Sequence, residues 1–172
     1  MSTTAKREQP AYLTSKSENW RTPVWFFQQL HKEFGFEIDL CASAENAQLA
    51  VFYTKDQDSL KQVWRGVCWM NPPYGRKATG GWVRKAYISA KRNKATIVCL
   101  IPARTDTRWW HKYCAKAEVR FIRGRLKFNG SKNAAPFPSA LVIFKPGMVA
   151  ATFYVDRHGS VMIVIAILWW LM

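Results

Sequence analysis

The sequence predicts an α/β fold with a doubly wound, mostly parallel sheet and an antiparallel edge. Segments typical of buried strands alternate with segments typical of helices, and this alternation is characteristic of a parallel sheet covered by helices on both faces. Closely spaced strand segments near the end of the chain predict an antiparallel hairpin at one edge. With 172 residues, of which 49% are hydrophobic, the chain can form one domain with a substantial core.

The first predicted helix begins at Thr22-Pro23 and ends near Phe34. A hydroxyl residue that caps the helix and a proline at its first position are typical of a helix start. Gly35 is typical of a helix end. Residues 36–40 are then expected to form a strand, and residues 46–50 a short helix.

The strongest strand signals lie in the middle of the chain. Residues 67–70 are apolar and stop at two prolines, and residues 95–101 are rich in β-branched side chains and stop at Pro102. The other predicted elements are helices at 82–92 and 106–117 and strands at 119–122, 126–128 and 140–144.

The predicted domain organisation is simple because no linker is long enough to divide the chain. Residues 1–18 are polar and aperiodic, which predicts a loose N-terminal arm, and residues 19–158 form the domain. The tail at 159–172 is mostly apolar but shorter than a usual membrane span of about 20 residues, so no membrane partner is expected. The tail could be a last strand or an oligomer contact.

The charge balance favours a polyanionic partner. The chain has 26 Lys and Arg against 11 Asp and Glu, a formal net charge of +15, and the basic residues occur throughout. Such an excess indicates nucleic acid as a partner, although a soluble surface that happens to be basic is the alternative.

The cysteines and histidines predict no metal site. The four cysteines form no C-x-x-C pair and the three histidines lie far apart, so neither zinc ligand spacing nor a disulfide framework is present. The N-terminal residues are polar rather than typical of a secretory signal. These features together predict a location in a reducing cytoplasm.

The most informative motif is Asn71-Pro72-Pro73-Tyr74, directly after the strand at 67–70. Two prolines cannot continue a strand, so the turn is displayed at the carboxyl end of a strand, where open α/β sheets bind ligands. An amide, a rigid carbonyl and an aromatic ring in one turn can hold a planar heterocycle and accept hydrogen bonds from its exocyclic amine. The alternative is a Pro-Pro turn with Tyr74 packed on the core.

The chain resembles the phage-type DNA N6-adenine methyltransferases, in which this turn is the catalytic loop. Motifs spread over most of residues 19–144 carry the resemblance. They are Asn19-Trp20-Arg21-Thr22-Pro23, Asp39-Leu40-Cys41-Ala42-Ser43, Asp58-Ser59-Leu60, Trp64-Arg65-Gly66, Asn71-Pro72-Pro73-Tyr74-Gly75, Ile101-Pro102-Ala103-Arg104 and Arg125-Leu126-Lys127-Phe128. The resemblance implies a Rossmann-like methyltransferase fold, S-adenosylmethionine as cofactor, and DNA as substrate in the host cytoplasm if a phage encodes the protein.

The resemblance implies catalytic roles for Asn71, Pro72 and Tyr74. The exocyclic nitrogen of adenine is a poor nucleophile because its lone pair is delocalised into the ring. If Asn71 Oδ1 and the Pro72 carbonyl each accept one N–H, the nitrogen is drawn toward a tetrahedral geometry with its lone pair facing the methyl group. Tyr74 is expected to stack on the base, a contact worth about 1–3 kcal/mol.

The resemblance also assigns cofactor contacts. Thr22 and Pro23 match the N-terminal cofactor motif, Asp39 lies at the end of the first strand, and Asp58 precedes the catalytic strand. Asp39 is expected to receive the methionine ammonium or a ribose hydroxyl, and Asp58 to lie by the cofactor adenine. A glycine-rich loop common in other methyltransferases is replaced by Leu40-Cys41-Ala42-Ser43. The alternatives are an N-cap for Thr22, a turn residue for Asp39 and a loop carboxylate for Asp58.

DNA contacts are expected next to the catalytic turn. A duplex hides the target nitrogen, so the base must be flipped out. Arg76 and Lys77, with Arg84 and Lys85, are candidate phosphate contacts, and Phe128 matches a late motif beside the flipped base. The alternatives are a solvated basic helix face for the cations and a core position for Phe128.

We therefore interpret the chain as a DNA adenine N6-methyltransferase that uses S-adenosylmethionine. Two alternatives remain at this stage. The same turn would suit an amino methyltransferase acting on RNA or on a protein glutamine, although the charge of +15 argues against a protein substrate. A nucleic-acid-binding protein without catalysis is the other, and its Asn71 would be dispensable.

Overall fold

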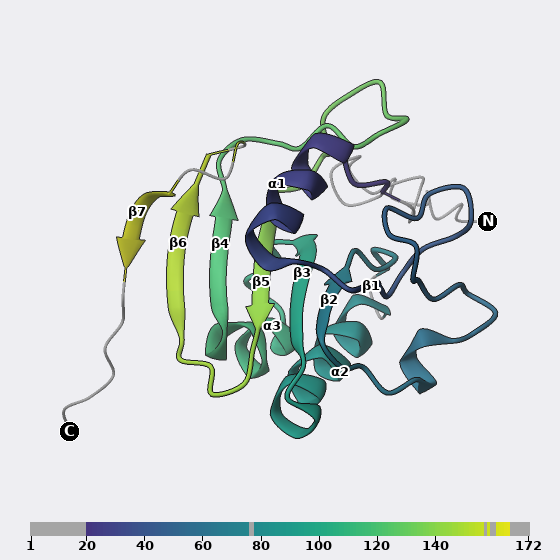
Figure 1. Ribbon diagram of the computed structural model, residues 1–172. Coiled ribbons are helices and arrows are strands. Elements are labelled where there is room, and N and C mark those ends of the chain that lie inside the picture. Colours follow the sequence, from purple (N-terminus) through teal and green to yellow (C-terminus); the bar gives the residue numbers. More distant parts are fainter. Residues whose placement is uncertain (1–19, 76–77, 157, 159–160, 166–172) are drawn as a thin grey trace, which may run out of the picture.

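The structure is a computed structural model, and it describes residues 20–75, 78–156, 158 and 161–165 (Figure 1). The expected N-terminal arm, Arg76, Lys77 and the end of the apolar tail lie outside the described residues. The described part forms one seven-stranded sheet in the order β1-β2-β3-β5-β4-β6-β7.

Five of the seven strands point in one direction. β1, β2 and β3 are parallel neighbours, β5 is antiparallel to both β3 and β4, β4 and β6 are parallel, and β7 is antiparallel to β6. The bounds are β1 Ile38–Asp39, β2 Val67–Met70, β3 Thr96–Pro102, β4 Glu118–Ile122, β5 Ser139–Phe144, β6 Ala151–Val155 and β7 Val161–Ile165. The predicted mostly parallel sheet with an antiparallel edge is confirmed. The edge pair is β6–β7, however, whereas the expected strands 119–122 and 140–144 form an antiparallel pair inside the sheet, β4 and β5.

Helices cover both faces of the sheet, as a doubly wound fold requires. α1 (Val24–Phe34) lies on one face, and α2 (Ala78–Asn93) and α3 (Arg108–Lys112) lie on the other (Figure 1). α1 ends at Gly35, whose φ of 65° is a left-handed conformation that glycine adopts without strain. None of the described helices is long and apolar enough to cross a membrane.

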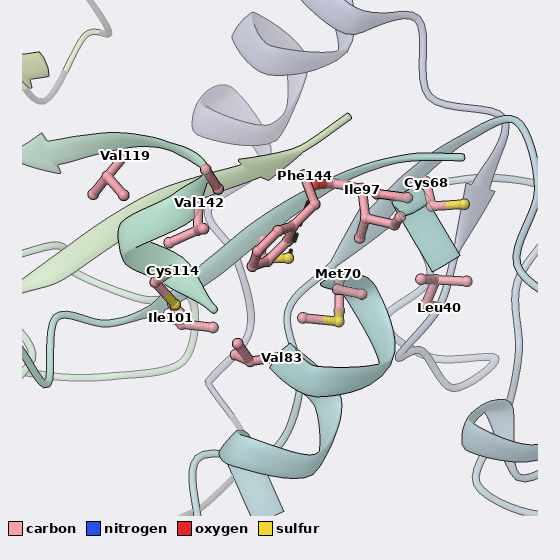
Figure 2. Packing of buried hydrophobic residues seen from close by; sticks show 14 of the residues in the cluster. Leu40, Cys68, Met70, Val83, Ile97, Ile101, Cys114, Val119, Val142 and Phe144 are labelled. Carbon is pink, nitrogen blue, oxygen red and sulfur yellow. Dashed lines mark hydrogen bonds between the residues drawn. The ribbon is translucent and has the colours of Figure 1, made fainter. Parts of the chain in front are cut away.

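The central strands are buried on both faces, and their side chains alternate between two cores. In β3, Ile97, Cys99 and Ile101 face α2 and α3, whereas Val98 and Leu100 face α1. Figure 2 shows the first core, where Phe144 of β5 and Met70 of β2 pack with Val83 of α2. A strand buried on both faces shows no polar alternation, which explains the apolar runs in the sequence.

Three predicted elements are shorter than expected or absent. The strand expected at 36–40 has two residues, the helix at 106–117 ends at Lys112 and continues as the 3₁₀ turn Cys114–Lys116, and residues 46–50 form turns. In the turns, the Asn46 side chain accepts the Ser43 N–H at 2.7 Å, and such local bonds compete with a helix. Trp, His and Tyr have modest helix propensity, which shortens α3.

Residues 126–128 are not a strand but part of the connection between β4 and β5. The Leu126 carbonyl accepts the Ala135 N–H at 2.8 Å, and the Phe128 carbonyl accepts the Ser131 N–H at 3.1 Å, so both bond within that connection. The sequence analysis also missed β6, whose side chains are mostly half-buried or exposed.

The expected start of α1 is wrong by one position. Pro23 is the N-cap rather than the first helical residue, and its carbonyl accepts the N–H groups of Phe26 and Phe27. No side chain caps the helix. The Thr22 hydroxyl therefore does not cap α1, and its contact lies elsewhere.

Candidate active site

Asn71 lies immediately after β2, at the carboxyl end of a central strand. Its side-chain Nδ2 donates hydrogen bonds to the Trp20 carbonyl and to Thr22 Oγ1, the latter at 2.9 Å. The segment that leads into α1 thus contacts a turn about 50 residues away in sequence. This long-range contact uses the Thr22 hydroxyl.

These contacts fix the orientation of the Asn71 amide. A carbonyl oxygen only accepts hydrogen bonds, so the side that faces Trp20 must be Nδ2 and not Oδ1. The oxygen Oδ1 accepts a hydrogen bond from the Tyr74 hydroxyl at 2.6 Å, and an amide oxygen has a second lone pair. The amide is held by Trp20, Thr22 and Tyr74, with one acceptor position of Oδ1 left for a further donor.

Tyr74 is a buried hydrogen-bond donor. Its side chain is 7% exposed, and its ring packs edge-on against Phe137 and Phe128 with centroids 5.5 and 6.2 Å away. The hydroxyl also approaches the Leu100 carbonyl at 3.0 Å. Burial raises the pKa of Tyr74 well above its ordinary value, so the hydroxyl keeps its proton. The expected stacking on a base has no exposed ring face to use here, and Tyr74 acts on Asn71 through its hydroxyl instead.

Asp39 is a buried carboxylate at the end of β1. It is 4% exposed, and its Oδ1 accepts the Cys41 N–H at 3.0 Å. Burial raises the pKa of Asp39 to about 6, and backbone hydrogen bonds from Cys41 and Gln48 offset only part of that rise. No Lys, Arg or His among the described residues forms an ion pair with it. A buried carboxylate without a cation favours a ligand with a positive charge or hydroxyl groups.

Asn71 and Asp39 line the same surface pocket at the carboxyl edge of the sheet. The other lining residues come from the segment before α1, the turns after β1, strand β2 and the Pro-Pro turn: Trp20, Arg21, Thr22, Cys41, Asn46, Gln48, Trp69, Pro72 and Pro73. No described residue donates a hydrogen bond to the Pro72 carbonyl. The structure therefore brings Asn71, Pro72, Thr22 and Asp39, which the sequence motifs assign to the site, to one pocket.

Four predicted site residues of the described part do not line this pocket, and one of them is the buried Tyr74. Pro23 is buried at the start of α1. Asp58 precedes the 3₁₀ turn Ser59–Lys61 and pairs with Lys61 at 3.0 Å on the surface. Phe128 is 1% exposed and packs against Trp20 with centroids 5.3 Å apart. It is therefore a core residue that contacts the pocket-lining Trp20. No described residues form a cluster of His, Cys, Asp and Glu suited to a metal ion.

Two side-chain amides of the pocket, those of Asn46 and Gln48, were not predicted from the sequence. Both line the pocket, and Gln48 Nε2 donates to the Thr22 carbonyl at 3.3 Å. The available signal was their position a few residues after Asp39, where the polar run Glu45-Asn46-Ala47-Gln48 follows a strand end. Because residues 46–50 were expected to form a helix, these polar residues were not considered as part of a loop at the site.

Comparisons with known proteins agree on one family. A family model described as DNA N-6-adenine-methyltransferase (Dam) matches residues 10–161. A DNA N-6-adenine-methyltransferase of Haemophilus phage HP1 is 29% identical over 147 residues, which cover 77% of this chain and 83% of that protein.

Two further relatives match shorter stretches. A protein of the same description from Escherichia phage T1 is 33% identical over 53% of this chain and 38% of its own length. The putative methyltransferase YfdM of Escherichia coli K12 is 34% identical over 40% of this chain and 85% of its own length.

Proposed function

Because the chain belongs to the DNA N-6-adenine-methyltransferase (Dam) family, it methylates adenine at N6 in DNA, and we propose that the transfer takes place in the pocket beside Asn71. The observation that carries this proposal is the fixed Asn71 amide. Its Nδ2 donates to Trp20 and Thr22, so Oδ1 faces the other way and can accept a hydrogen bond from an amine N–H.

Asn71 and Pro72 act on the adenine amine. One N–H donates to Asn71 Oδ1 and the other to the Pro72 carbonyl, which lacks a donor among the described residues. These two bonds draw the nitrogen away from conjugation with the ring and turn its lone pair toward the pocket. Acceptors fixed before the reaction need no rearrangement during it, and this accounts for most of their effect.

Tyr74 and Thr22 hold Asn71 rather than the base. The Tyr74 hydroxyl limits the rotation of the amide from the Oδ1 side, and Thr22 does so from the Nδ2 side. Neither Asn71 nor the Pro72 carbonyl is a base, so the proton that the nitrogen releases after the transfer passes to water. The target base reaches the pocket only outside the base stack, since a duplex covers the amine.

Asp39, Asn46 and Gln48 form the proposed cofactor side of the pocket. S-adenosylmethionine, the proposed cofactor, supplies an electrophilic methyl group when bound. A buried carboxylate and two amides fit its ammonium and ribose hydroxyl groups, and no described Lys, Arg or His forms an ion pair with Asp39.

The test is to identify the methylated nucleoside. The protein is incubated with labelled S-adenosylmethionine and duplex DNA, the DNA is digested, and the nucleosides are separated by mass spectrometry. We expect labelled N6-methyladenine, with far less label in an RNA of the same sequence. Methylcytosine without methyladenine, or label in RNA or protein alone, would overturn the proposal.

A further inference from the structure

A groove next to the catalytic pocket has features that the methyl transfer does not use. It is lined by Trp25 of α1 and by residues of the connection from β4 to β5, and this connection runs along the top of the molecule in Figure 1. The groove has a volume of about 420 Å³ and is lined by Trp25, Arg125, Leu126, Lys127, Phe128, Asn129, Gly130 and Ser131.

Basic and polar side chains point outward along one wall of this groove. Arg125, Lys127 and Asn129 are exposed, whereas the alternate residues Leu126 and Phe128 are 2% and 1% exposed. The two buried side chains anchor this segment in the core that also contains Phe26, Phe27 and Leu30 of α1, while the residues between them are exposed to solvent. Neither Arg125 nor Lys127 forms an ion pair with another described residue.

The opposite wall carries an exposed tryptophan. Trp25 is on the first turn of α1 and is 42% exposed, although its neighbours Phe26 and Phe27 are buried. An aromatic ring beside unpaired cations suits a nucleic acid, whose phosphates attract the cations and whose sugars and bases pack on the ring. A protein partner with an apolar surface fits the groove less well, because binding it would remove water from the two unpaired cations.

The groove lies next to the catalytic pocket, because Asn129, which lines the groove, is bonded to Arg21 and Thr22, which line the pocket. Asn129 N donates to the Arg21 carbonyl at 2.9 Å, and Asn129 Nδ2 donates to the Thr22 carbonyl at 3.4 Å. The segment 20–22 therefore contacts the groove on one side and Asn71 on the other. A DNA strand lying in the groove would be adjacent to a base in the pocket.

We propose that this groove binds the DNA backbone next to the target adenine, with Arg125 and Lys127 on phosphates and Trp25 against a sugar or base. The proposal rests on the proposed function, since it takes DNA as the substrate of the neighbouring pocket. The net charge of +15 is spread over the whole sequence and does not by itself identify the surface that binds DNA. The proposal identifies that surface as this groove.

The test measures the salt dependence of DNA binding. Each phosphate neutralised contributes about −0.9 to the slope of log affinity against log salt concentration on duplex DNA, so R125A/K127A should make the slope shallower by about 1.8. The matched control is R92A/K116A, which removes the same charge from exposed positions at the amino ends of β3 and β4. Binding to a short duplex of mixed sequence is followed by fluorescence anisotropy.

Two outcomes overturn the proposal: an unchanged slope in R125A/K127A, or an equal change in both pairs, which would show only a general effect of net charge. Calorimetry with S-adenosylmethionine separates a failed proposal from a misfolded variant, because R125A/K127A should keep its cofactor affinity. Failure of the function itself would look different, since the unmodified protein would then produce no methyladenine.

Trp25→Ala provides a second, independent readout. This change should weaken DNA binding by about tenfold while leaving the salt slope unchanged, since the ring neutralises no phosphate. Trp25→Phe should retain most of the affinity. A Trp25→Ala protein that binds DNA as tightly as the unmodified protein would remove α1 from the proposed surface.

Discussion

The two buried carboxylates at Asp39 and Glu118 have pKa shifts in opposite directions. Burial raises the pKa of Asp39 to about 6. Burial would also raise the pKa of Glu118, but hydrogen bonds from Lys145 and Arg120 outweigh it and hold the pKa below its ordinary value. Arg120 in turn donates two bonds to Glu33, at 2.7 and 2.8 Å.

The difference separates a structural cluster around Glu118 from the proposed cofactor side of the pocket around Asp39. Around Glu118 the charges are matched, and they join β4 to α1 and to the end of β5. Around Asp39 the described residues supply backbone N–H groups but no cation, and the carboxylate lines a pocket. A buried charge left unpaired destabilises the fold, so its retention at a pocket indicates binding. Four experiments test this comparison.

The largest expected effect is on turnover in Asn71→Ala. Removing a fixed acceptor from the reacting nitrogen should lower kcat by about 10²–10³-fold, while calorimetry shows little change in cofactor affinity. Asn93→Ala is the matched control, because Asn93 Nδ2 also donates to a tryptophan carbonyl, that of Trp64 at 3.2 Å, far from the pocket. Turnover near normal in a folded Asn71→Ala protein would remove Asn71 from the reaction.

The second prediction concerns the stability of Asp39→Asn. Folding raises the pKa of Asp39 from 3.8 to about 6, so the protonated form is favoured in the folded chain. The stability that this carboxyl contributes is fully present below about pH 4 and is lost as the pH rises through 6. Asp39→Asn should therefore raise the free energy of unfolding by up to about 3 kcal/mol at pH 8 and by little at pH 4.

Urea unfolding at both pH values checks this prediction. The same substitution that raises the stability at pH 8 should weaken cofactor binding. At pH 8 the Asp39→Asn variant should bind S-adenosylmethionine more weakly than the unmodified protein, whereas at pH 5, where Asp39 is mostly protonated, the two affinities should converge. A variant that is less stable at pH 8 would show that Asp39 has a partner in the folded chain.

The third prediction concerns Arg120→Met, in the structural cluster. This change leaves Glu118 and Glu33 without their shared partner and should lower the free energy of unfolding by about 2 kcal/mol at pH 7. Lys145→Met should lower it less, because Lys145 is about half exposed and Glu118 is its only ion-pair partner in the part of the chain that the structure describes. Neither change should alter the KM for the cofactor, and such an alteration would show that the two clusters are coupled.

The smallest expected effect is in Thr22→Val, which removes one of the bonds that hold the Asn71 amide. The loss of one hydrogen bond, about 1 kcal/mol, should lower kcat by about fivefold. Thr22→Ser keeps the hydroxyl and should restore turnover. If cofactor affinity falls in Thr22→Val while kcat stays unchanged, Thr22 binds the cofactor directly and does not position Asn71.

Local sequence alone determined the central strands and the catalytic turn. The apolar runs of β2 and β3 and the prolines that end them are chemical constraints that act within a few residues, so the position of Asn71 at a strand end followed directly. Gly35 likewise determined the end of α1. The burial of Phe128 was not decided locally, because it depends on packing against Trp20, more than 100 residues away in sequence. The turn that replaces the expected helix at 46–50 has a local cause, the bond from the Ser43 N–H to the Asn46 side chain, and Gln48 adds a bond to the distant Thr22 carbonyl.

Only the tertiary structure decided how the site is assembled. Thr22 looks like a helix cap in the sequence, yet its hydroxyl binds Asn71, which is 49 residues away. Tyr74 looks like a stacking ring, yet Phe128 and Phe137 bury it and leave its hydroxyl on Oδ1. Hydrogen-bond partners and exposure arise from segments brought together by the sheet, and a linear pattern of residue types does not contain that proximity.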